Sequence, residues 1–144
     1  MENCNLDFIN EVLRNASVAL LSIKDVTDSV DHYELRNELR SEYERYEKFS
    51  DELKAYMKDN GYEIKDVSKM KKFMMWSAIK MNTAADDSRS HIAEIMIKGT
   101  VMGITELNKI INDSACVSDE KALEFAKKLL QMEEEFEENL KKYL

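Results

Sequence analysis

Residues 5–26 have the sequence NLDFINEVLRNASVALLSIKDV, and their apolar positions set the expected fold. These positions are alternately three and four residues apart, which brings them to one side of an α-helix. The side chains on this side are Leu6, Ile9, Leu13, Ala16, Leu20 and Ile23. The pattern predicts an amphipathic helix that packs in a helical bundle, with Asn3 or Asn5 as its N-cap.

The same helical periodicity recurs along the rest of the chain. It predicts long helices over 31–60 and 88–112, and a last one that starts at Ser118 with Asp119 and Glu120 in its first turn. The expected start and stop signals are a capping box of Asp31 and Glu34, Gly61 after the second helix, and Ser88 or Ser90 before the third. The expected core positions are Leu35, Leu39, Glu42, Tyr46, Phe49, Leu53 and Tyr56, then Ala122, Ala126, Leu129, Glu133, Phe136, Leu140 and Tyr143.

The helix expected at 88–112 differs from the others because apolar residues cover nearly its whole circumference. A helix that is apolar all round is normally buried, so we expect this one to be the most buried element. Only one stripe is polar, formed by His91, Glu94, Lys98, Thr105 and Lys109.

The connection between the second and third long helices is too long for a simple turn. A shorter helix is predicted over about 66–80, and about 15 helical residues span roughly 22 Å. A connection of this length is typical of crossover bundles such as the ferritin-like fold. Met74 and Trp76 lie in this segment. They suit either the underside of a crossover helix or an adaptable surface for a partner.

Composition excludes several classes of protein. The chain has 144 residues, no proline and three glycines, which argues against β-sandwiches, barrels and dinucleotide-binding folds. Its length favours a single domain over 1–144. A net charge of −8 argues against a nucleic-acid partner, and no apolar run is long enough to span a membrane.

The N-terminal residues lack the pattern of a signal peptide, so the expected location is cytoplasmic. The chain has two cysteines, Cys4 and Cys116. We expect them to be reduced thiols there, although the sequence leaves a single bridge open.

One stretch is similar to a known group of proteins. Residues 90–104, SHIAEIMIKGTVMGI, resemble uncharacterised bacterial ferritin-like four-helix proteins, a domain of unknown function. The similarity extends back through 74–83 and forward to 140–144, about half of the chain. The resemblance implies a crossover bundle and implies no activity.

A di-metal carboxylate centre is the chemistry most often built in this architecture, and it needs Glu-x-x-His on two helices. Neither His32 nor His91 follows a glutamate by three residues, so a complete centre is not expected. Glu42, Glu106 and Glu133 each fall among apolar core positions. They are either a site for iron or manganese with fewer ligands than a complete centre, or carboxylates that reach water or pair with arginine.

Two glycines lie four residues apart, and we expect Gly99 or Gly103 to let another helix approach closely, within the subunit or between subunits. The sequence predicts no catalytic residue and no cofactor. The leading hypothesis is a non-enzymatic bundle that acts through self-association or a protein partner. The alternative is a degenerate ferritin-like carboxylate protein with a metal-binding or redox role.

Overall fold

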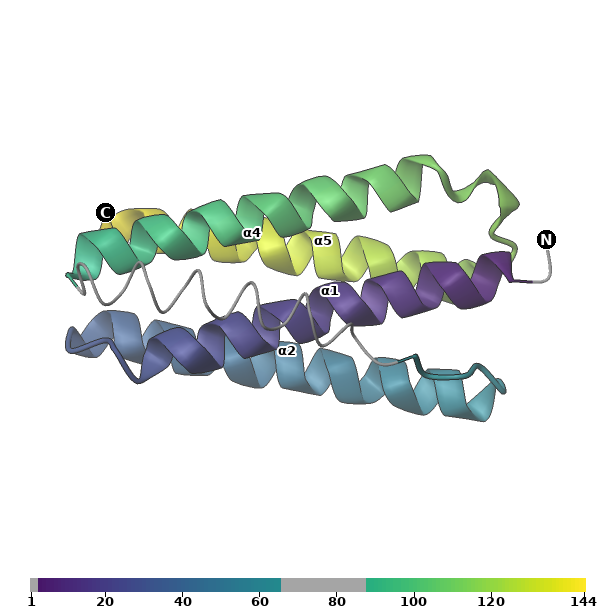
Figure 1. Cartoon of the computed structure of the whole chain (residues 1–144), viewed down its shortest axis with the longest axis horizontal. Coiled ribbons are helices and arrows are strands. Elements are labelled where there is room, and N and C mark those ends of the chain that lie inside the picture. Colours follow the sequence, from purple (N-terminus) through teal and green to yellow (C-terminus); the bar gives the residue numbers. More distant parts are fainter. Residues whose placement is uncertain (1–2, 66–87) are drawn as a thin grey trace.

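The computed structural model describes residues 3–65 and 88–144 (Figure 1). These residues form helices and no strand, which confirms the all-α prediction. The long helices are α1 (Cys4–Thr27), α2 (Tyr33–Asp59), α4 (Arg89–Asn112) and α5 (Glu120–Leu140). Two short 3₁₀ turns, Ser114–Cys116 and Lys141–Tyr143, flank α5.

The helices lie side by side as an elongated bundle (Figure 1). α1 packs against α2 and α4, and α5 packs against α4. α2 ends and α4 begins at opposite ends of the bundle, so these two helices run in the same direction (Figure 1). The predicted crossover helix at 66–80, with Met74 and Trp76, lies outside the described residues.

The helix ends follow local chemistry, with two corrections. α2 is capped by His32, whose Nδ1 accepts from the Leu35 amide at 3.2 Å, so the predicted capping box was wrong. α5 is capped by Asp119, one residue after the expected Ser118, and its carboxylate accepts from two backbone amides. Gly61 has a φ of 72° and ends α2 as predicted. Ser88 caps α4, also as predicted.

The core follows the predicted faces of α1, α2 and α5. All of the predicted core positions of α5 are buried, and Tyr143 in the turn after it is buried too. Edge-to-face aromatic pairs join α2 to α5, with ring centroids 5.8 Å apart for Phe49 and Phe125 and 6.1 Å apart for Tyr46 and Phe136. These contacts fix the side of each helix that faces the interior.

α4 is not the most buried helix, which corrects the prediction. Its only buried residues are Ile92, Ala93, Met96 and Leu107, half as many as in each of the other long helices. Val101 is 41% exposed and Met102 is 65% exposed. The helix is apolar all round, but α1 and α5 cover only part of its circumference.

Cys4 and Cys116 form a disulfide, so the expectation of reduced thiols was wrong. The bridge joins the start of α1 to the turn before α5, and hydrogen bonds of the adjacent Asn5 support it. The Asn5 side chain donates to the Ser118 hydroxyl at 3.0 Å and accepts from the Ser118 and Asp119 amides. Within the described part of the chain, no helix is long and apolar enough to cross a membrane.

Candidate functional site

Three polar side chains are buried midway along the bundle. Glu42 and Tyr46 lie one turn apart on α2, and Glu133 lies on α5. Their exposed fractions are 2%, 0% and 2%. Within the described residues, Glu42 Oε2, Tyr46 Oη and Glu133 Oε1 have no hydrogen-bond partner. We call these three residues the carboxyl–phenol cluster.

Gly103 of α4 makes room for the Glu133 side chain. A Cβ atom at Gly103 would lie 2.5 Å from Glu133 Oε1 and 3.1 Å from Oε2, both too short for a contact. The Asn15 side chain on α1 donates to the Gly103 carbonyl at 3.1 Å, which helps to hold α4 in place. Gly103 therefore has a close neighbour, but it is a side chain, and the predicted close approach of another helix backbone stays a prediction.

Gly99 does not share this role. Among the described residues, no atom lies within 4 Å of the position that a Gly99 Cβ would take. Residues four apart on a helix differ by about 40° around its axis, so a contact at one need not include the other. Of the two glycines, Gly103 alone has a close neighbour among the described residues.

Burial dominates the electrostatics of the cluster. It raises the pKa of Glu133 to about 8, because the charged carboxylate loses its hydration. Burial also raises the pKa of Glu42, although the neighbouring Arg45 acts in the opposite direction. The pKa of Tyr46 is raised well above 10.0 by burial and then by the charges of Glu133 and Glu42. The phenol therefore lies within the electrostatic range of both carboxyl groups.

Arg45 links the cluster to the surface. Its guanidinium donates to Glu42 Oε1 at 3.1 Å and to Glu135 Oε2 at 3.0 Å. The Arg45 side chain is 41% exposed, so one end of this ion-pair chain reaches solvent. The interpretation that arginine pairs with Glu42 is confirmed for one of its two oxygen atoms.

The predicted three-carboxylate site is wrong as a set, because Glu106 is exposed on α4 while Glu42 and Glu133 are buried. The described residues contain no group of three or more histidine, cysteine or acidic side chains that could hold a metal ion. His91 lies 4.0 Å from Glu94 near the surface, and His32 is occupied as the cap of α2. A two-metal carboxylate–histidine centre therefore does not fit the described residues.

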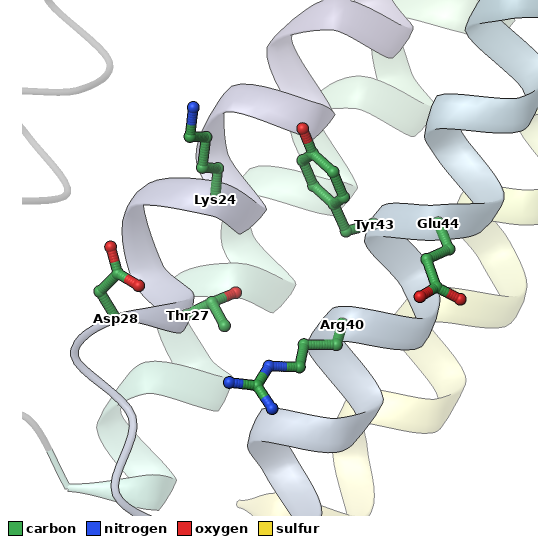
Figure 2. A pocket seen from close by; sticks show the side chains of 6 residues that line it. All are labelled: Lys24, Thr27, Asp28, Arg40, Tyr43 and Glu44. Atoms are coloured by element: carbon green, nitrogen blue, oxygen red, sulfur yellow. The ribbon is translucent and has the colours of Figure 1, made fainter.

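A surface hollow of about 310 Å³ lies between α1 and α2 (Figure 2). Two basic and two acidic side chains line it, so their charges cancel and neither an anion nor a cation is favoured. None of the lining residues is buried. They are Lys24, Thr27, Asp28, Arg40, Tyr43 and Glu44.

A second polar cluster surrounds the cap of α5, and sequence reasoning missed it. Asp119 accepts from the Tyr56 hydroxyl at 2.8 Å and from the Tyr62 hydroxyl at 2.6 Å. Burial and these bonds raise the pKa of both tyrosines to about 12. Burial opposes ionisation of Asp119, but the tyrosine and backbone bonds outweigh it and lower its pKa. The polar groups satisfy one another, so the cluster is structural.

Comparison with known proteins adds no relative. No protein-family model matches the chain, and no curated protein sequence or solved structure is significantly similar to it.

Proposed function

We propose that the protein acts as a non-enzymatic helical bundle that associates with a second copy of itself through the outer face of α4. This face combines exposed apolar side chains with a regular pattern of charge. The pattern of charge is the observation that carries the proposal, because it is complementary to that of an antiparallel second copy.

Five exposed side chains, three or four residues apart, form a stripe along one side of α4. We call Glu94, Lys98, Met102, Glu106 and Lys109 the α4 stripe. Met102 lies at its centre and is 65% exposed. Exposed apolar residues rimmed by charged ones are a common feature of protein interfaces.

The charges of the α4 stripe run negative and positive before Met102, then negative and positive after it. In an antiparallel pair centred on Met102, Lys98 of each copy faces Glu106 of the other, and Glu94 faces Lys109. A parallel pair would place like charges together, which is unfavourable. The stripe is thus complementary to itself only in the antiparallel direction. A single helix–helix contact is a small interface, so the dissociation constant should be on the order of micromolar.

Sedimentation equilibrium over a range of protein concentrations tests the proposal. We expect the wild type to dimerise, and Met102→Glu, Lys98→Glu and Glu106→Lys each to weaken the dimer by about tenfold or more. The double variant Lys98→Glu/Glu106→Lys should restore it, because both copies exchange their charges together. Glu134→Lys makes the same charge change on the exposed side of α5 and should have little effect. A wild type that stays monomeric, or a double variant no better than the single ones, would overturn the proposal.

A further inference from the structure

The Cys4–Cys116 disulfide lies at the end of the bundle where α1 begins and α4 ends (Figure 1). The proposed self-association does not use it. We infer that this bridge is a reversible redox switch, which thiols of the glutathione class open and their disulfides close while the helices stay folded. The bridged chain is the more stable form, because the bridge constrains the unfolded chain. The redox state of the surroundings therefore sets how readily the protein unfolds.

One sulfur atom of the bridge is accessible from solvent. Cys116 is exposed in the 3₁₀ turn Ser114–Cys116, whereas Cys4 is half-buried at the start of α1. Thiol–disulfide exchange requires a thiolate to reach one of the two sulfur atoms, and exposed bridges are typically the labile or regulatory ones. An attacking thiolate therefore reaches the Sγ atom of Cys116.

The position of Cys4 favours its release from the bridge. Cys4 is the first residue of α1, where the helix dipole stabilises a negative charge. When a thiolate attacks Cys116, the S–S bond breaks and its electron pair leaves on Cys4, which becomes a thiolate. The Asp7 carboxylate in the same turn opposes this charge, but Lys65 pairs with Asp7 at 3.1 Å. Cys4 is therefore the better leaving group of the two cysteines.

Two thiol molecules complete the reduction. The first forms a mixed disulfide with Cys116, and the second attacks the sulfur of the first and displaces the Cys116 thiolate. The protons of the two thiols pass to Cys4 and Cys116, and the reductant leaves as its disulfide. The chain thus gains two electrons and two protons, and the reverse sequence closes the bridge again.

Contacts that involve no sulfur hold the two cysteines near each other when the bridge is open. The Asn5 side chain, next to Cys4, bonds to Ser118 and Asp119 on the other side of the bridge. Phe8 and Ile9 are buried, so they anchor the first turns of α1 in the core. Both thiols therefore keep their places in the reduced chain, and the bridge can close again within the same molecule.

Equilibration in buffers of reduced and oxidised glutathione, at about pH 7, tests the inference because purely structural disulfides resist reduction by glutathione. The free thiols are alkylated and counted by mass spectrometry. We expect the native protein to convert between the bridged and the two-thiol forms, with helical circular dichroism in both and a lower melting temperature for the reduced form. Alkylation during the reduction should trap glutathione on Cys116 and the alkyl group on Cys4. A bridge that opens only in denaturant, a reduced chain without helical signal, or glutathione trapped on Cys4 would overturn the inference.

Asn5→Ala tests the contacts that keep the two thiols together. It retains both sulfur atoms and removes the three hydrogen bonds of the Asn5 side chain. The ratio of bridged to reduced protein should therefore fall by about tenfold in the same glutathione buffers. Asn37→Ala makes the same change at an exposed position of α2 and should leave that ratio unchanged. Equal ratios for the wild type and Asn5→Ala, or bridges formed between two molecules on reoxidation, would show that the fold does not hold the thiols together and would overturn the inference.

Discussion

Replacing Glu133 with glutamine should remove a large part of the pH dependence of the free energy of unfolding. Burial raises the pKa of Glu133 to about 8 in the folded chain, whereas its ordinary value is 4.5. Between these values the folded chain keeps a proton that the unfolded chain has released, so raising the pH favours unfolding. The free energy of unfolding should fall by about 1.4 kcal/mol per pH unit, or about 5 kcal/mol over the whole interval.

This loss in the free energy of unfolding is absent below pH 4.5, the ordinary pKa of Glu133, and complete above its folded pKa of about 8. Urea unfolding followed by circular dichroism, in steps from about pH 5 to about pH 9, measures it. The solutions need constant ionic strength and a chelator, which keeps cations away from the carboxyl groups. Glu134→Gln removes an exposed acid from the same helix and should keep the wild-type slope. Parallel pH profiles for the wild type and Glu133→Gln would refute the reasoning.

Four further predictions concern the free energy of unfolding, measured by denaturant unfolding. Gly99→Ala should stabilise the protein by up to about 1 kcal/mol, because the added Cβ meets no described atom and alanine favours a helix. The free energy of unfolding of Gly103→Ala should be about 1–3 kcal/mol lower than that of Gly99→Ala, because the added Cβ overlaps with a buried carboxyl group. Equal free energies for the two variants would contradict this. Replacing both Cys4 and Cys116 by serine should cost about 5 kcal/mol, because the bridge closes a loop over a separation of 112 residues. A reductant should lower the stability of the wild type but not that of this variant. Asp119→Ala should cost about 2–4 kcal/mol, since it removes a helix cap and leaves two tyrosine hydroxyls without their acceptor; a loss below about 0.5 kcal/mol would refute that role.

The helices could be predicted because the contrast between their apolar and charged sides is strong. Along α2 and α5, apolar positions at helical spacing alternate with charged ones, so the pattern gives both the length of each helix and its buried side. Glu42 and Glu133 were placed in the core by this contrast, and both are buried. Their burial could be predicted because their apolar neighbours above and below leave no other side for them.

The same reasoning failed for Glu106 because α4 lacks that contrast. The apolar residues of this helix lie all round its circumference, so the pattern does not indicate which side faces the bundle. In the structure that side carries Ala93, Met96 and Leu107, and Glu106 points outward beside the exposed Met102. The error in the predicted carboxylate set and the error in the predicted burial of α4 therefore have one physical cause.

The disulfide depends on topology, which local patterns do not contain. α1 and α4 run in opposite directions, so the start of α1 and the end of α4 meet at one end of the bundle (Figure 1). Cys4 and Cys116 have Cα atoms 6.1 Å apart only because of that arrangement. No spacing rule connects residues so distant in sequence, and the same holds for the bonds from Asn5 to Ser118.

The contact between Gly103 and Glu133 combines two features that each reduce stability. Glycine inside a helix costs about 1 kcal/mol relative to alanine, and burying a carboxyl group without a partner costs more. If the two were unrelated, either could be replaced without regard to the other. They touch, so an alanine at position 103 first requires the Glu133 side chain to move. A core selected for packing alone would use alanine and leucine at these positions. Gly103 and Glu133 therefore act as a pair, and the effect of a substitution at one depends on the residue at the other.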